Sequence, residues 1–183
     1  GLVVPHKLTD ALGKWYTPTP GPRSWQAIME GNLTGLLRQW TAFTYANGGA
    51  MRYPRKGWVF SEATPWYFPP QAEFEPLYDF IRRNRGLFDD YEAVEQVGVL
   101  FTQTTAGFAA PYYSPVKQVC ANLVTQQIPF GFAVAGDENL ANRLTGGEAA
   151  RFEVMLIPEP IRLIDGQQAI VERRVHQYLF NDH

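Results

Sequence analysis

The spacing of apolar residues changes abruptly in the middle of the chain. From residue 72 to residue 85 they lie three or four positions apart, after two prolines and before Gly86. This pattern predicts an amphipathic helix that ends at a left-handed glycine. An acidic stretch follows, and residues 97–101 (VGVLF) are apolar throughout, as in a parallel strand buried on both faces. The sequence therefore predicts that one architecture ends and another begins near residues 86–96.

After residue 96, short apolar runs alternate with helical patterns. The predicted strands are residues 97–101, 129–134 and 152–157. The predicted helices are residues 115–127, a short one near 138–144, and 165–180. Such alternation is typical of a doubly wound parallel sheet with right-handed crossovers. Three strands are fewer than such a sheet normally has, so we expect an incomplete α/β domain.

The first half of the chain has a different pattern. Three prolines and a glycine in residues 15–23 exclude a regular helix or a central strand there. A long helix is predicted from an N-cap at Ser24 through Tyr45, weakened by two internal glycines. Residues 50–53 form a strand candidate, and a loop dense in aromatic side chains follows. This order is typical of the last units of a (β/α) barrel, in which such loops carry the site.

Composition and charge exclude several classes of partner. The 183 residues are 45% apolar and 19% charged, enough to bury a core, and the net charge is −2. No basic stripe is present, which argues against nucleic acid. No apolar run approaches the length of a membrane span. The N-terminus shows no signal-peptide pattern, which favours a cytoplasmic location.

The residue types that bind metals are sparse. Cys120 is the single cysteine and lies on the apolar stripe of a predicted helix, so it is predicted to be a core residue. The three histidines are scattered, and no two have the spacing of metal ligands. We therefore predict neither a disulfide nor a metal site.

Aromatic residues make up 14% of the chain, and all five tryptophans lie in its first half. Indole rings in loops serve as platforms for sugars or bases, and the lack of basic surface favours sugar. Trp58 and Trp66 are candidates for stacking on a sugar ring, although they could instead pack the loop onto the barrel rim. Glu62, between them, either binds hydroxyl groups or pairs with a neighbouring cation. Arg52, in the strand candidate, completes the predicted substrate-binding set.

Residues 21–56 and 69–102 together resemble a junction found in glycoside hydrolases of the family 42 β-galactosidase type and their relatives. The matching motifs are the turn at residues 46–49 (ANGG), the helix end at 84–88 (NRGLF) and the apolar run at 97–101. In that family a TIM barrel ends at this point, and a flavodoxin-like domain similar to class I glutamine amidotransferases follows.

The resemblance implies a domain organisation and an activity. Residues 1–85 would be the end of a TIM-barrel catalytic domain, 86–96 a linker, and 97–183 an incomplete flavodoxin-like domain. The activity would be hydrolysis of glycosidic bonds, with a carbohydrate as substrate. The protein would be a homo-oligomer, or the chain would lie against the remainder of a larger protein.

The family's mechanism uses two glutamates about 5 Å apart, one as acid/base and one as nucleophile. Residues 1–23 contain Asp10 as their single carboxylate and no glutamate. We therefore expect the catalytic pair to lie outside this chain, and we assign no catalytic residue within it.

Two alternatives remain open for the α/β half. It could be a non-catalytic interaction or oligomerisation module. Residues 102–107 faintly resemble the FMN phosphate loop of flavodoxins, but seven further residues separate them from the helix, so no cofactor is predicted. A glutaminase is not expected, because residues 157–160 (IPEP) stand where its nucleophilic cysteine would be, and Cys120 lies on a different predicted helix.

Overall fold

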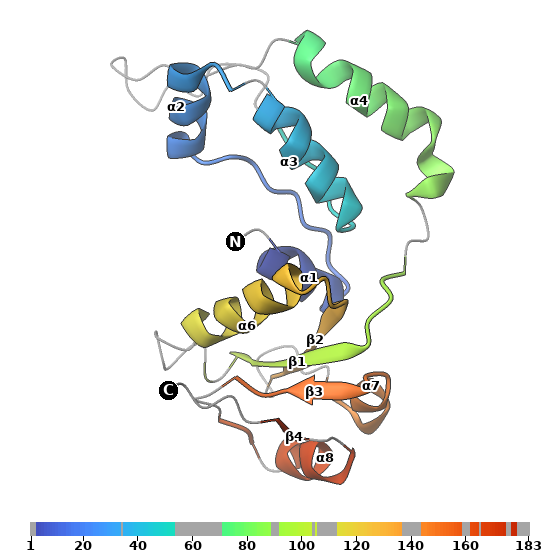
Figure 1. The fold of residues 1–183 in the computed structure, drawn as a ribbon. Coiled ribbons are helices and arrows are strands. Elements are labelled where there is room, and N and C mark those ends of the chain that lie inside the picture. The colour runs from blue at the N-terminus through green and yellow to red at the C-terminus, as the bar shows by residue number, and fades with distance from the viewer. Residues whose placement is uncertain are drawn as a thin grey trace. The chain divides into compact units, whose positions relative to one another are not determined.

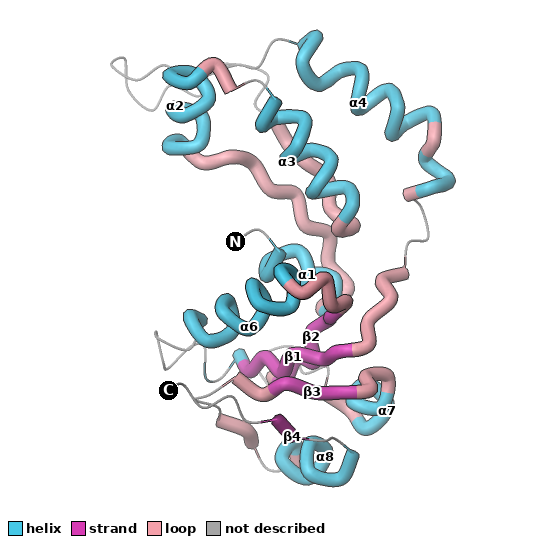
Figure 2. The backbone as a smooth tube through the Cα atoms, viewed as in Figure 1, coloured by secondary structure: helices cyan, strands magenta, loops and turns pink. Residues whose placement is uncertain are grey.

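The computed structural model forms two compact units, unit 1 from Gly1–Lys14 with Glu92–His183 and unit 2 from Trp15–Tyr91. Figures 1 and 2 show their helices and strands. The structure describes residues 3–33, 35–53, 71–88, 92–103, 105, 113–136, 144–158, 162–164, 166–174 and 177–178. Among these, none of the helices has the length and apolar character needed to cross a membrane.

Unit 1 contains a parallel sheet with the strand order β2-β1-β3-β4. The strands are β1 (Val97–Thr102), β2 (Phe130–Ala135), β3 (Val154–Leu156) and β4 (Gln177–Tyr178). Val97 is in register with both Phe130 and Val154, so β1 is paired on both sides. The strands predicted at 97–101 and 129–134 are confirmed, and the parallel α/β class with them. The third strand is shorter than predicted.

The helices of unit 1 are α1 (Val3–Ala11), α6 (Tyr113–Thr125), α7 (Gly146–Ala150) and α8 (Gln167–Arg174). The predicted helix over 165–180 is wrong in its second half. Residues 177 and 178 pair with Met155 and Leu156 instead, because a tertiary strand partner outweighs local helical spacing. The short helix predicted near 138–144 falls almost entirely outside the described residues. Helix α7, which was not predicted, begins at Gly146, where the Thr145 hydroxyl accepts a hydrogen bond from the Glu148 N–H at 3.0 Å. Residues 137–143 lie outside the described residues.

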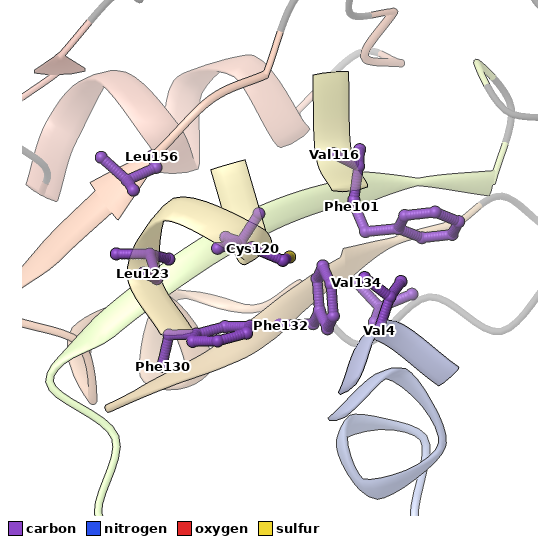
Figure 3. Packing of buried hydrophobic residues seen from close by; sticks show 10 residues of the cluster. Val4, Phe101, Val116, Cys120, Leu123, Phe130, Phe132, Val134 and Leu156 are labelled. Carbon is purple, nitrogen blue, oxygen red and sulfur yellow. The ribbon is translucent and has the colours of Figure 1, made fainter. Parts of the chain in front are cut away.

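Alternate strand residues enter two different apolar clusters. Val99 and Phe101 join Phe132 in the first cluster, to which α6 contributes Val116 and Cys120 (Figure 3). The second cluster contains residues of the same strands that alternate with these, together with residues of α7 and α8: Leu100, Ala133, Ala135, Ala149, Met155 and Val171. The sheet is therefore covered on both faces, which explains why its strands are apolar throughout.

Helix α1 is the main correction to the predicted domain boundaries. Residues 1–14 were grouped with the barrel half, but they belong to unit 1. Val4 is 3% exposed and packs in the first cluster beside Phe132 and Val134 of β2 (Figure 3). Strand β2 is an edge strand, yet all six of its residues are buried. The apolar residues of α1 thus pack against a strand more than a hundred residues further along the chain.

A carboxylate fixes the amino-terminal side of this sheet. Glu95 Oε1 lies 3.3 Å from Lys7 Nζ, and Glu95 Oε2 lies 2.9 Å from Arg151 Nη1. The Glu95 side chain is only 6% exposed. A Cβ at Gly131 would overlap its carboxylate, so glycine at this position in β2 makes room for the ion pairs. Glu95 belongs to the acidic stretch predicted as a linker, and it joins α1 to the segment after α7.

The buried histidine of α1 makes the stability of unit 1 depend on pH. His6 is 1% exposed, and burial lowers its pKa from the usual 6.5. The unfolded chain therefore binds the proton more readily below pH 6.5. We expect the contribution of His6 to the free energy of unfolding to be constant above pH 6.5. As the pH is lowered from 6.5, the free energy of unfolding should decrease by up to about 1.4 kcal/mol per pH unit. Urea titrations between pH 8 and 5.5 measure this, and His6→Leu should have a flatter profile. Equal slopes for the two proteins would contradict the assignment.

Unit 2 contains α2 (Pro22–Gly31), α3 (Gly35–Ala46), α4 (Gln71–Arg83) and a short 3-10 turn, η1 (Arg85–Leu87). The predicted helix from Ser24 to Tyr45 is broken in two. Asn32 is left-handed (φ 47°), and its N–H bonds back to the Ile28 carbonyl, which ends α2. The helix also starts earlier than predicted, with Gly21 as N-cap and a proline in its first turn.

Helix α4 is confirmed over nearly its predicted length. Its end differs from the prediction, because Gly86 lies inside η1 and not in a left-handed cap. Aromatic rings join α4 to its neighbours: Tyr53 stacks on Phe74 with centroids 5.3 Å apart, and Tyr78 meets Tyr45 edge to face at 6.0 Å. Much of the aromatic content of the first half therefore forms a structural cluster.

Candidate functional site

Two extended segments of unit 2 run side by side in parallel. The Ala50 N–H donates to the Tyr16 carbonyl and the Arg52 N–H to the Pro18 carbonyl, both at 3.0 Å. From the first bond to the second, the donor and the acceptor both move two residues toward the C-terminus, as they do between two parallel strands. The predicted strand at 50–53 is not a regular strand, because its partner contains prolines that have no N–H to return the bonds.

Helices α3 and α4 contact the second segment, and α4 runs opposite to it. Tyr53, at the end of the second segment, contacts the start of α4 through Phe74 and donates to the Leu37 carbonyl at 2.9 Å. Met51, two residues earlier, accepts a hydrogen bond from Tyr78 further along α4. Each segment therefore ends where the following helices begin. In parallel α/β folds, that carboxyl edge is where ligands bind.

Burial alternates along both segments. Pro18 and Met51 are buried, whereas Thr17, Thr19 and Arg52 are exposed. The hydrogen bonds put Arg52 in register with Thr19, and side chains in register on a parallel pair share one face. A guanidinium and two hydroxyls therefore occupy the face away from the helices, close to the carboxyl edge.

The structure places one of the four predicted substrate-binding residues. Arg52 is exposed at the carboxyl edge, and no carboxylate of the described residues forms an ion pair with it. Trp58, Glu62 and Trp66 lie outside the described residues. Thr17 and Thr19 were missed by the sequence analysis, which treated residues 15–23 only as a loop. The alternation of threonine with proline at 17–20 was the available signal.

The phenols near this edge have a structural role. Burial raises the pKa of Tyr53 and of Tyr78, so both remain protonated donors at neutral pH. Their hydroxyls hold the second segment against α3 and α4 through bonds to backbone carbonyls. Tyr53 thereby fixes the backbone next to Arg52.

The carboxyl edge of the sheet in unit 1 is a second place to look for a site. Here the Arg162 N–H donates to Thr105 Oγ1 at 2.7 Å, and the Thr105 N–H donates to Thr102 Oγ1 at 3.0 Å. The Gln167 amide donates to the Gly136 carbonyl and accepts from the Ile164 N–H at 3.1 Å. These bonds join the segments that follow β1, β2 and β3 to one another.

Cys120 has a structural role in unit 1. Cys120 is 1% exposed, and burial raises its pKa to about 12, so the thiol is protonated at neutral pH. This confirms the prediction that it is a core residue. Within the described residues no group of three or more histidine, cysteine, aspartate or glutamate side chains is placed to hold a metal ion.

A comparison with known proteins gives one informative match. The sequence is 27% identical over 140 residues to an alpha-agarase from Thalassotalea agarivorans. The chain is similar to part of a glycoside hydrolase. The match covers 75% of this chain and 9% of the alpha-agarase, so the chain spans about a tenth of that relative's length. No family model matches the sequence, and no solved structure matches the fold.

The similarity to the alpha-agarase agrees with the coarse level of the sequence prediction, a resemblance to glycoside hydrolases. It does not extend to the β-galactosidase type of family 42 or to the two-carboxylate mechanism. The family 42 type and the two-carboxylate mechanism stay predictions. The same holds for the oligomeric state and for the four substrate-binding residues.

Proposed function

We propose that this chain is part of a carbohydrate-active glycoside hydrolase and that unit 2 supplies one side of its sugar site. The observation that carries the proposal is the similarity to an alpha-agarase over three quarters of the chain. The proposed sugar site lies at the carboxyl edge of the parallel segments of unit 2, where Arg52 is exposed. The sequence that continues from Tyr53 contains Trp58, Glu62 and Trp66, the other proposed sugar contacts.

The order of elements in unit 2 supports the proposal that it is the end of a (β/α) barrel. An extended segment leads to α2 and α3, a second parallel segment leads to α4, and α3 and α4 both contact the second segment. Exposed polar residues occupy the other face of the segments, which would be the interior of a closed barrel. In such a barrel, residues at the carboxyl ends of the strands contact substrate.

Unit 1 is proposed to be a flavodoxin-like domain with a role in assembly. Its strand order, 2-1-3-4, is the flavodoxin-like order without the last strand. In the proposal, contacts of unit 1 with identical subunits, or with further polypeptide of the same protein, hold the enzyme together. The alternative, a chain that serves only as an interaction module, predicts no affinity for polysaccharide.

The proposed mechanism requires two carboxylates, and the two described segments at this edge supply neither. Residues 15–21 and 50–53 contain no aspartate or glutamate. The chain's contribution would be to bind and orient the sugar chain while the acid/base and the nucleophile come from elsewhere in the protein. We expect the 183-residue chain to release no reducing ends from agarose. Robust release would show that the catalytic pair is present in it.

Affinity electrophoresis tests the sugar site directly. The chain is run in native polyacrylamide gels with and without dissolved low-gelling agarose, and retardation gives the affinity. We expect retardation of the wild type and about a tenfold loss of affinity for Trp58→Ala and Trp66→Ala, because each change removes one stacking platform.

Trp15→Ala is the matched control. Trp15 is 82% exposed but stands at the amino-terminal end of the first segment, away from the carboxyl edge. Its replacement should leave retardation unchanged. A wild type that no polysaccharide retards would contradict the proposed function, and an equal loss for Trp15→Ala would remove the assignment to the loop after Tyr53.

A further inference from the structure

Arg52 is the single charged side chain in the two paired segments. Residues 15–21 and 50–53 otherwise contain only aromatic, small, apolar and hydroxyl side chains. The Arg52 side chain is exposed, and among the described residues it has no acidic partner within ion-pair distance. The whole chain carries a net charge of −2, so this edge differs in sign from the average surface.

The backbone of Arg52 is held in place on both sides. Its own N–H bonds to the Pro18 carbonyl at 3.0 Å. The next residue, Tyr53, stacks on Phe74 and bonds to the Leu37 carbonyl. Because the backbone is already ordered, ligand binding at Arg52 loses little backbone entropy, so the position is suited to recognition.

Two hydroxyls share the face of Arg52. Thr19 is in register with Arg52. Thr17 lies two residues earlier on the same face, and both threonines are exposed. A guanidinium offers several N–H donors in a planar fork, and hydroxyls add single donors beside it. This donor set matches an oxyanion, whose several oxygens accept more than one hydrogen bond.

We propose that Arg52, with Thr19 beside it, binds an anionic substituent of the sugar chain, a sulfate ester or a carboxylate. The inference rests on the proposed function and specifies its substrate class as an acidic polysaccharide. Arg52 is then a specificity-determining residue: it favours substituted sugar units over neutral ones. The Thr19 hydroxyl donates one further hydrogen bond to the anion.

The test compares polysaccharides that differ in charge, again by affinity electrophoresis of the 183-residue chain. Gels contain neutral agarose, sulfated carrageenan, the same carrageenan after desulfation, or carboxylated pectate. We expect the charged form to be bound about tenfold more tightly than its neutral counterpart. Preference for carrageenan over its desulfated form assigns a sulfate ester, and preference for pectate assigns a carboxylate.

Variants assign that preference to the residues. Arg52→Gln should abolish the difference between charged and neutral polysaccharide, Arg52→Lys should retain part of it, and Thr19→Ala should reduce it a few-fold. The matched control is Arg82→Gln on α4, whose side chain is 78% exposed and is paired with Asp79. This change removes the same charge from another part of unit 2 and should leave the preference intact.

The two proposals fail in different ways. Equal affinity for charged and neutral polysaccharides, or an equal loss of preference in Arg82→Gln, overturns the role of Arg52 while the sugar site stands. Absence of retardation in every gel overturns both the sugar site and this inference.

Discussion

Phe132→Ala should unfold unit 1 under conditions in which unit 2 remains folded. Phe132 is fully buried in β2 and meets Phe101 and Phe130 edge to face, with centroids 6.0 and 6.2 Å apart. Removing a buried aromatic ring costs about 3–5 kcal/mol, because transfer energy is lost and a cavity remains. That is a large fraction of the stability of a domain of this size.

The measurement uses the uneven distribution of tryptophan. All five tryptophans lie within residues 15–91, so their fluorescence reports on unit 2, while circular dichroism reports on both units. For Phe132→Ala we expect the urea midpoint of the dichroism to fall and the tryptophan midpoint to stay. Val124→Ala is the control, since Val124 is 46% exposed on α6 and its truncation should change little. A parallel shift of both signals would show that the units unfold together.

Val4→Asp should release α1 from the sheet. Val4 is 3% exposed in the first apolar cluster, and a carboxylate there would be buried without a counter-charge, at a cost of several kcal/mol. Detachment exposes the apolar side chains of the first cluster, which can then associate with another chain. We expect increased binding of an apolar dye and earlier elution in size-exclusion chromatography.

The control for this change is Val94→Asp. Val94 belongs to the same unit and is 77% exposed, so the same substitution adds the same charge without burying it. It should leave dye binding and elution unchanged. If Val4→Asp also behaves as the wild type, α1 is not what protects β2.

Strands and helices were predictable where the pattern of neighbouring apolar residues alone indicates burial. Val99 and Leu100 point into different clusters, and a run that is apolar throughout is the direct result of burial on two faces. Cys120 was predictable for the same reason, because the stripe to which it belongs packs on one of those faces. The start of α4 followed from its prolines and the spacing of its apolar residues.

Features that depend on distant partners were not predictable. Nothing near Val4 indicates that it will pack on β2, and residues 177–178 leave a helical pattern only because β3 pairs with them. The same limit applies to the candidate site. Arg52 was a candidate from its place in the sequence, but Thr19 became one only when the hydrogen bonds set the register of two proline-interrupted segments.

The discontinuity of unit 1 has a consequence for biosynthesis. Residues 15–91 are synthesised between α1 and the sheet, while β1 and the strands after it are still untranslated. Helix α1 is made before the sheet and has no docking surface until β2 emerges, and the Lys7–Glu95 pair must close a separation of 88 positions. During this interval its apolar face is open to chaperones or to other nascent chains. The synthesis of β2 therefore decides when α1 can reach its native position.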